Sequence, residues 1–518
     1  MDQPIGATGN LRLIRRSQRM QEVEMRQLQI SGEVLTDETS IKRYSTDMSH
    51  YLVKPMMIAA PLDQEDLAKI IAYSKEEAIP ITPRGAGSNQ SGSAVGSGII
   101  VLFSKMNVIT KREGLRVKVQ PGIIHQKLDD QLNMDGLRIP YDPSSRSFCT
   151  IGGHVATKAS GLRSLKYGTV DSSLRSLCFF DVAHGLIDTK QGLPENLEEA
   201  IVDLTNRLRS DKETRHILNA RGKLKSSSGY NLQSFYEYEE EREIVTHLLV
   251  GSVGTLGVFS EIELEAVSCP KSTILYLMFF RSLVDAVKDV AKLKIFEPSA
   301  IEVMDSYGVS LLRNEISVPS DCRAVLFVEF DSDLDRVGEL MLNHLKEESI
   351  KFLVETDAEK QAAFWKIRES MLLWIMNILE TPEKRFPPFA DDLAIPINQL
   401  PNFLVTIQAI LDRFGTIAVI YGHAGEGNLH IRPMINKENW EENLRNLSDL
   451  IFQAALKAGG TITGEHGLGR NRSKYLRNEW GDKVYGYFER IKKIFDPEGL
   501  LNPDVVFTSD DLTKNLKL

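Results

Sequence analysis

Residues 81–103 read ITPRGAGSNQSGSAVGSGIIVLF, and this stretch carries most of the information about the fold. An apolar lead-in ends at Pro83, a loop with five glycines follows, and the run IIVLF has the composition of a second strand. Such a loop exposes many backbone N–H groups and can bind an anion. It lacks the Gly-Lys-Ser/Thr ending of a Walker loop, and it continues into a strand where a Rossmann turn would continue into a helix. Taken alone, an ordinary glycine-rich loop explains it equally well.

Two further segments are rich in small residues. Residues 150–168 read TIGGHVATKASGLRSLKYG, and residues 251–257 read GSVGTLG before the strand-like VFSEIELEAV. We expect each of the three loops to leave a strand, with small residues where a ligand approaches the backbone closely. Three such loops suggest one extended ligand, and a dinucleotide would fill the site.

Two short runs near the C-terminus offer metal ligands. Residues 422–430 read GHAGEGNLH and lie between two apolar stretches, a pattern that predicts a β-hairpin; residues 464–469 read GEHGLG. His423, His430 and Glu465 could bind a metal through two imidazoles and one carboxylate, which would leave open positions as a catalytic site requires. His466 would then be free to act as a base. The competing interpretation is that the histidines are surface or packing residues.

The composition is that of an ordinary globular protein. Of 518 residues, 42% are hydrophobic and 26% charged, and the net charge of −9 argues against a nucleic-acid-binding protein. The four cysteines form no CxxC pair, which excludes a ferredoxin-type cluster signature and fits a reducing cytoplasm. No apolar run reaches the ~18 residues of a membrane span, and no signal peptide is evident.

The chain divides into four parts. We expect a helical arm over residues 1–48, including an amphipathic helix near 11–30, and a glycine-rich domain over 49–270. Within the latter, residues 190–225 predict one or two additional helices. Residues 271–505 alternate strand and helix patterns, which indicates an α+β domain, and residues 506–518 form a charged tail.

These motifs together resemble the flavoprotein family of vanillyl-alcohol oxidase and p-cresol methylhydroxylase. Within it the chain is similar to the branch that contains a glycolate oxidase subunit, FAD-linked D-lactate dehydrogenase and D-2-hydroxyglutarate dehydrogenase. The matching pieces are PRGAGSNQSGSAVG, TIGGHVATKASG with KYG, SGYNL, GSVGTLG, the GHAGEGNLH and GEHGLG pair, and FDPEGLLNP at 495–503. They follow the family order over roughly nine-tenths of the chain.

The resemblance implies a two-part FAD-binding domain of the p-cresol methylhydroxylase type and a C-terminal α+β cap domain that presents the substrate. The residues expected at the FAD site are Pro83, Arg84, Gly85, Ala86, Gly87, Ser88, Asn89, Gly92, Ser93, Pro121, Thr150, Ile151, Gly152, Gly153, Ala156, Gly161, Tyr167, Gly168, Gly254, Leu256, Gly257 and Asn502. The first glycine loop has no histidine, so the FAD should be non-covalent. His154 stands where relatives commonly have Asn, and we interpret it as a packing or pyrophosphate-side variation.

The resemblance also implies the chemistry. A 2-hydroxy acid would chelate a divalent metal (zinc, manganese or iron(II)) on His423, His430 and Glu465, with His466 as the base and hydride transfer to the flavin. Arg368 in FWKIRES would clamp the substrate carboxylate. Asn428 would orient the substrate or touch the flavin, and the alternative is that it only shapes the turn. Val253 replaces the glutamate that the family usually has in the third loop. Residues 390–396 lack the lysine of 2-hydroxyglutarate enzymes, which favours D-lactate or glycolate.

The resemblance leaves the partners open. Without a cysteine cluster, the electrons should pass to a separate acceptor: an iron–sulfur subunit, an electron-transfer flavoprotein, a quinone or a cytochrome. Homo-oligomers and a peripheral position at the membrane through a partner also stay open. Two alternative functions are an alkylglycerone-phosphate synthase-like transferase and an accessory flavin subunit of a larger redox complex.

Overall fold

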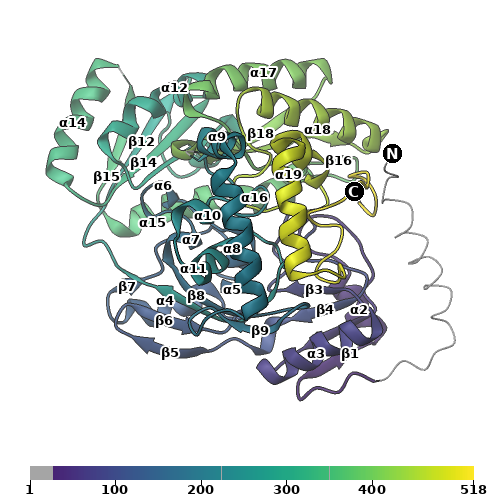
Figure 1. The fold of residues 1–518 in the computed structure, drawn as a ribbon. Coiled ribbons are helices and arrows are strands. Elements are labelled where there is room, and N and C mark those ends of the chain that lie inside the picture. Colours follow the sequence, from purple (N-terminus) through teal and green to yellow (C-terminus); the bar gives the residue numbers. More distant parts are fainter. Residues whose placement is uncertain (1–26, 223, 349, 518) are drawn as a thin grey trace.

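The structure is a computed structural model that describes residues 27–517 except 223 and 349. It contains three main sheets. Two belong to the N-terminal domain in the lower half of Figure 1, and the largest belongs to the cap in the upper half. Helices and strands mix in both halves, which confirms the predicted α+β class.

The first sheet surrounds the glycine-rich loop. Its order is β1-β2-β4-β3, where β2, β3 and β4 are parallel and β1 is an antiparallel edge. The strands are β1 (Glu33–Leu35), β2 (Met57–Ala60), β3 (Ile81–Arg84) and β4 (Ile99–Leu102). Helix α3 (Gln64–Glu77), capped by the Asp63 side chain, buries Leu67 and Ile70 against them. The strand–loop–strand prediction for residues 81–103 is confirmed.

The second sheet is antiparallel, in the order β5-β6-β10-β8-β9. Its strands are β5 (Ile109–Glu113), β6 (Arg116–Val119), β8 (Leu174–Asp181), β9 (Gly185–Asp188) and β10 (Val258–Glu265). The helices of this part of the chain are α4 (His125–Asn133), α5 (Ile151–Thr157), α6 (Ser164–Tyr167), α7 (Val170–Ser173), α10 (Ser234–Glu237) and α11 (Glu241–Leu248). The predicted extra helices are present as α8 (Glu195–Ser210) and α9 (Lys212–Arg221).

The cap is built on a sheet of order β15-β12-β14-β13-β18-β19-β17. Its strands are β12 (Ile274–Phe280), β13 (Ala300–Met304), β14 (Ala324–Phe330), β15 (Lys351–Glu355), β17 (Leu393–Ala394), β18 (Ala418–His423) and β19 (Asn428–Pro433). Its helices are α12 (Leu283–Leu293), α13 (Ser306–Leu312), α14 (Leu334–Glu347), α15 (Ala358–Glu369), α16 (Met371–Trp374), α17 (Leu400–Arg413) and α18 (Trp440–Lys457).

Both faces of the central cap strands are covered, so these strands are mostly apolar. Tyr276 and Met278 of β12 join the core that includes residues of α12 and α17, whereas Leu275 and Leu277 face the core that includes α15. The alternation follows from the period of two along a strand. Figure 1 shows α12 and α17 along the outer edge of the cap and α15 nearer the N-terminal domain. Strand residues that contribute to a site between the two domains therefore lie on the face toward α15.

The predicted hairpin of residues 422–430 is confirmed. Strands β18 and β19 pair around a 3₁₀ turn at Ala424–Glu426, with Tyr421 opposite His430 and His423 opposite Asn428. Gly427 ends the turn with φ 72°, a conformation that favours glycine. The two histidines lie on one face of the hairpin because they occupy alternate positions on paired strands.

The C-terminal segment returns to the N-terminal domain. Helix α19 (Leu476–Phe495) leads to Leu501, which pairs with Ile81 beside strand β3. Lys483 of α19 contacts Asp211 at the start of α9, with 2.7 Å between Nζ and Oδ1. The expected cap of residues 271–505 therefore contributes to the first sheet at its C-terminal end. Of the tail, Leu516 pairs with Tyr51.

Three predictions about local structure were wrong. The described part of the arm, residues 27–48, contains strand β1 and the short helix α2 (Glu38–Tyr44), so it is not a helical arm; most of the predicted helix near 11–30 lies outside the described residues. Residues 151–157 form helix α5 and not the predicted loop, because the Thr150 side chain caps the amide of Gly153. The GSVGTLG loop follows helix α11 and not the predicted strand. The IVTHL run of this helix resembles a strand in composition.

Among the residues that the structure describes, no helix is both long enough and apolar enough to cross a membrane.

Candidate active site

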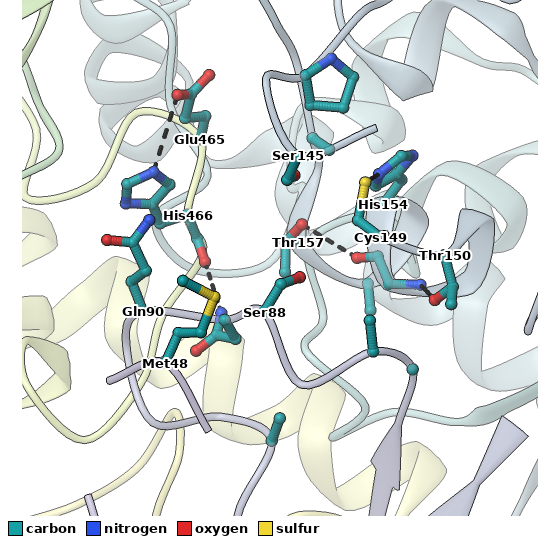
Figure 2. Close-up of a pocket in the computed structure, with 18 of the residues that line it drawn as sticks. Met48, Ser88, Gln90, Ser145, Cys149, Thr150, His154, Thr157, Glu465 and His466 are labelled. Carbon is teal, nitrogen blue, oxygen red and sulfur yellow. Dashed lines mark hydrogen bonds and ion pairs between the residues drawn. The ribbon is translucent and has the colours of Figure 1, made fainter. Parts of the chain in front are cut away.

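A cavity of about 280 Å³ lies between the N-terminal domain and the cap. The glycine-rich loop, helix α5 and the 253–257 loop line one side. Helix α15, the hairpin and the GEHG loop (residues 464–467) line the other. Figure 2 shows Glu465 and His466 on one side of this cavity and His154 on the opposite side.

Sixteen residues predicted for FAD line the cavity. They are Pro83, Arg84, Gly85, Ala86, Gly87, Ser88, Asn89, Ser93, Pro121, Thr150, Gly152, Gly153, Ala156, Gly161, Gly254 and Gly257. Among the described residues, the backbone N–H groups of Ala86, Gly87, Ser88 and Asn89 have no protein acceptor, so they are free to bind a phosphate. A Cβ on Gly152 would come within 2.6 Å of the Pro121 Cβ, so this wall requires glycine. Free amides beside a glycine-lined wall fit a dinucleotide.

Six residues predicted for FAD do not line the cavity: Gly92, Ile151, Tyr167, Gly168, Leu256 and Asn502. Ile151 and Leu256 are buried in the core, and the Tyr167 hydroxyl donates to Asp331 of the cap. Asn502 donates to the carbonyl oxygens of Ser93 and Val253 at 2.9 and 2.7 Å. Asn502 therefore ties two cavity-lining loops together from behind, and its contact with the flavin stays a prediction.

His154 lies in a buried cluster at the edge of the cavity. Its Nε2 lies 2.7 Å from the Cys149 Sγ, and its Nδ1 lies 3.3 Å from the Tyr141 hydroxyl. Burial lowers the pKa of His154 well below its usual range, and it raises the pKa of Cys149 to about 12. A neutral ring beside a neutral thiol is a packing arrangement.

Three imidazoles converge on one carboxylate oxygen. The Nε2 atoms of His423, His430 and His466 lie 3.0, 3.4 and 3.8 Å from Oε1 of Glu465. The rings of His430 and His466 are stacked, with centroids 5.2 Å apart. Convergent nitrogens around a carboxylate oxygen are a donor set that suits zinc, manganese or iron(II).

The outer nitrogens of two of these rings are also hydrogen-bonded. The Nδ1 of His423 lies 2.6 Å from Oε1 of Glu302, and that of His430 lies 2.8 Å from the carbonyl oxygen of Asp391. Acceptors at Nδ1 orient both rings so that Nε2 faces Glu465, where it would bind a metal, as in known metal sites. Asp392 also has an oxygen near His430, Glu465 and His466. It already accepts from Thr463 and the amides of Glu465 and His466, so it is better suited to hold the loop than to bind a metal.

The charges around the cluster set its protonation. Burial lowers the pKa of His423, but the carboxylates of Glu302 and Glu465 outweigh this effect and raise it to about 9. Burial opposes ionisation of Glu465, yet His423 and Lys225 hold its pKa well below the usual range. Burial also opposes the charged form of His466, but Asp392 and Asp391 raise its pKa. The site therefore stabilises a carboxylate at Glu465 and a proton on His466.

Arg368 reaches the cavity, whereas Asn428 does not. Arg368 is almost fully buried, lies over the Tyr421 ring and contacts Glu302 with 2.6 Å between Nη2 and Oε2. Asn428 is completely buried and donates to Asp392 Oδ1 at 3.0 Å. Arg368 therefore reaches the cavity, and Asn428 supports the GEHG loop through Asp392.

A buried cluster of charges behind the site was missed in the sequence. Asp391 and Asp392 are fully buried and pair with Arg472, and Asp391 also contacts Arg432 with 2.8 Å between Oδ2 and Nη2. An acidic pair before the apolar LAIP, and an arginine inside the apolar strand β19, were signals that could have identified it.

Lys225 was missed as well, although it ends the segment 190–225. Its Nζ lies 3.0 Å from Oε2 of Glu465 and 3.1 Å from Oε2 of Glu426. The Ser160 hydroxyl donates to the same Glu465 oxygen at 2.5 Å. These two contacts leave Oε1 of Glu465 facing the histidines. Nothing in the local sequence indicates this role, because the partners are 240 and 201 residues away.

Two family models match the chain. One describes an FAD binding domain and matches residues 55–189, and the other describes the C-terminal domain of FAD linked oxidases and matches residues 269–506.

Several curated proteins are similar over most of the chain. Glycolate oxidase subunit GlcD of Bacillus subtilis (strain 168) is 28% identical over 509 residues, covering 94% of this chain and 97% of that protein. A D-lactate dehydrogenase of Anaerostipes hadrus is 27% identical, with 87% and 89% covered. A D-2-hydroxyglutarate dehydrogenase of Pseudomonas putida is 28% identical, and the match covers 92% of this chain but 50% of that protein.

Solved structures share the fold at low identity. p-Cresol methylhydroxylase aligns with a TM-score of 0.65 at 12% identity, covering 91% of this chain and 93% of that one. An alkyldihydroxyacetonephosphate synthase aligns with a TM-score of 0.66 at 17% identity, covering 97% and 87%. With an FAD-binding domain, a matching oxidase C-terminal domain and this fold, the chain belongs to the p-cresol methylhydroxylase-type family of FAD-linked oxidoreductases.

Proposed function

We propose that the protein is an FAD-dependent dehydrogenase that oxidises a D-2-hydroxy acid, with D-lactate or glycolate favoured, to the 2-keto acid. The observation that carries the proposal is the convergence of three imidazole nitrogens on Glu465 at the cavity wall opposite the FAD-binding loops, with Arg368 beside them. The names of the similar proteins, glycolate oxidase subunit and D-lactate dehydrogenase, support the same substrate class.

The site residues have separate tasks. His423, His430 and Glu465 would hold a divalent metal, which would lower the pKa of a hydroxyl group bound to it. The Arg368 guanidinium binds the substrate carboxylate, for which its planar fork is suited. In its neutral form, which a nearby divalent cation would favour, His466 takes the hydroxyl proton at Nε2, and Asp391 and Asp392 stabilise the imidazolium that results. When bound, FAD would supply the acceptor for the hydride from the substrate Cα.

The lining of the cap side favours a monocarboxylate. Beyond Arg368 the cavity is lined by Glu369, Leu372 and Leu373. A carboxylate and two leucines offer no favourable contact to a second carboxylate, since like charges repel and an unpaired buried charge is costly. This agrees with the absence of the family's lysine from residues 390–396.

Electrons must leave the FAD for the next turnover. One similar protein is named as a subunit, which supports transfer to a separate component. We propose an iron–sulfur subunit, an electron-transfer flavoprotein or a quinone as the acceptor, and a cytoplasmic location that allows a peripheral position at the membrane.

The direct test is anaerobic visible absorption of the FAD-loaded protein during addition of D- and L-2-hydroxy acids. D-lactate or glycolate should bleach the oxidised flavin band. Prior removal of divalent metal with a chelator should slow bleaching by about 100-fold or more, because the metal supplies several kcal/mol of charge stabilisation. Zinc, manganese or iron(II) should restore the rate. A flavin band that no 2-hydroxy acid bleaches with metal present would contradict the proposal and favour the transferase or accessory-subunit alternatives.

The glycine wall gives an independent prediction about FAD. Replacing Gly152 with valine should weaken FAD binding roughly 5- to 150-fold, because the new side chain overlaps Pro121 and such overpacking costs about 1–3 kcal/mol. The measurement is a fluorescence titration of the apoprotein with FAD. Gly486→Val in α19 is the matched control, since no atom lies within 4 Å of its added Cβ. Equal FAD affinity of Gly152→Val and the parent would show that this wall does not contact the cofactor.

A further inference from the structure

Glu302 is a single charged residue in the apolar strand β13. It is completely buried, and it faces the same side of the sheet as Ala300 and Met304, toward α15. A fully buried carboxylate is expensive unless both oxygens are paired. The two oxygens of Glu302 have different partners, and each partner belongs to a different half of the proposed site.

One oxygen serves the proposed metal-binding half. Oε1 accepts from Nδ1 of His423 at 2.6 Å, so the proton of that ring stays on Nδ1. The other ring nitrogen, Nε2, faces Glu465 at 3.0 Å and would offer its lone pair to a metal bound there. A carboxylate behind a ligating histidine fixes both its tautomer and its orientation, and it raises its basicity.

The other oxygen serves the carboxylate-binding half. Oε2 accepts from Nε of Arg368 at 2.9 Å and lies 2.6 Å from its Nη2. The guanidinium is therefore held in one orientation above the Tyr421 ring, at 4.9 Å from the centroid. An arginine that is ordered before the substrate arrives loses less side-chain entropy on binding.

We propose that Glu302 is a positioning residue that couples metal binding at His423 to recognition of the substrate carboxylate by Arg368. The inference rests on the proposed function, because it assumes a metal bound to His423, His430 and Glu465. One buried carboxylate aligns both groups, so disturbing it should affect both together.

The decisive variant is Glu302→Gln. A glutamine retains the shape, but its amide group offers one acceptor and one donor in place of two acceptors. If its oxygen accepts from His423, its NH₂ group faces the donors of Arg368. If the glutamine amide is turned around, its NH₂ group donates to Nδ1 of His423. The ring proton then moves to Nε2, which blocks metal binding at that nitrogen.

The main readout is zinc affinity of the FAD-loaded protein, measured by competition with a chromogenic chelator. Glu302→Gln should weaken zinc binding about 10- to 100-fold, as is typical of lost second-sphere partners, with FAD content unchanged. In turnover with the hydroxy acid that bleaches the parent flavin, its KM should also rise. Glu302→Asp retains the charge on a shorter side chain and should lie between the parent and Glu302→Gln, which provides a second test if Glu302→Gln folds poorly.

Glu329→Gln on the neighbouring strand β14 is the matched control. Glu329 is also completely buried and pairs with Arg163, with 2.6 Å between Oε2 and Nη2, but it does not contact the cluster. It should lose stability and retain parental zinc affinity. Parental zinc affinity in Glu302→Gln and Glu302→Asp would overturn the coupling while leaving the proposed function intact. A parent protein that binds no zinc, manganese or iron(II) would overturn both.

Discussion

Replacing His466 with alanine should lower kcat/KM for the hydroxy acid by about 10²- to 10⁴-fold, the usual contribution of a general base. The ring lies at the cavity wall with its side chain 18% exposed, so it can reach a substrate hydroxyl. Its Nδ1 faces Asp391 and Asp392 at 3.7 and 3.9 Å, which stabilises the protonated ring after the transfer. Alanine removes the acceptor of the proton but not the FAD-binding loops.

The measurement is the anaerobic rate of flavin reduction in a single turnover, with FAD and metal content determined on the same sample. Both contents should equal those of the parent protein. His216→Ala is the matched control, because His216 lies exposed on α9, outside the cavity. A His466→Ala variant that reduces its flavin within tenfold of the parental rate would assign proton removal to another group.

Replacing Arg472 with methionine should lower the free energy of unfolding by about 3–5 kcal/mol, the cost of breaking a buried ion pair from one side. Arg472 and both of its partners are completely buried, with 3.1 Å between Nη2 and Asp391 Oδ1 and 3.3 Å between Nη1 and Asp392 Oδ2. Methionine fills much of the volume but leaves two carboxylates with one fewer cation. Burial opposes ionisation of Asp391, and Arg432, His466 and Arg472 together lower its pKa.

Loss of Arg472 should also disturb the GEHG loop, because Asp392 accepts hydrogen bonds from the backbone amides of Glu465 and His466. Denaturant unfolding of the FAD-loaded protein measures the stability. Arg445→Met is the control: Arg445 forms exposed pairs with Glu441 and Asp511, and such pairs contribute about 0–1 kcal/mol. A loss below about 1 kcal/mol in Arg472→Met would show that the charge cluster is relaxed or solvated, in contrast to its complete burial.

Motifs whose residues are close in sequence were predictable. The strands around residues 81–103 and the hairpin of residues 422–430 follow from local composition and glycine placement, and both are present. The convergence of His423 and His430 follows from strand alternation across that hairpin. Wrong predictions also arose from local sequence. Thr150 caps helix α5 shortly before two glycines, but the run of small residues around it predicts a loop.

Contacts between distant segments were not predictable. Glu302 and His423 are 121 residues apart, and Lys225 and Glu465 are 240 residues apart. No periodicity relates such pairs, because their distance depends on how separate elements pack.

By itself, the sequence determined the family, the FAD-binding loops and the candidate ligands, because backbone freedom at glycine and the ligand chemistry of histidine and glutamate are properties of short segments. Only the tertiary structure decided which charges support those ligands. Burying a carboxylate or a lysine is favourable only with a partner in contact, and in this protein the partners come from other strands, from α15 and from the segment after α9.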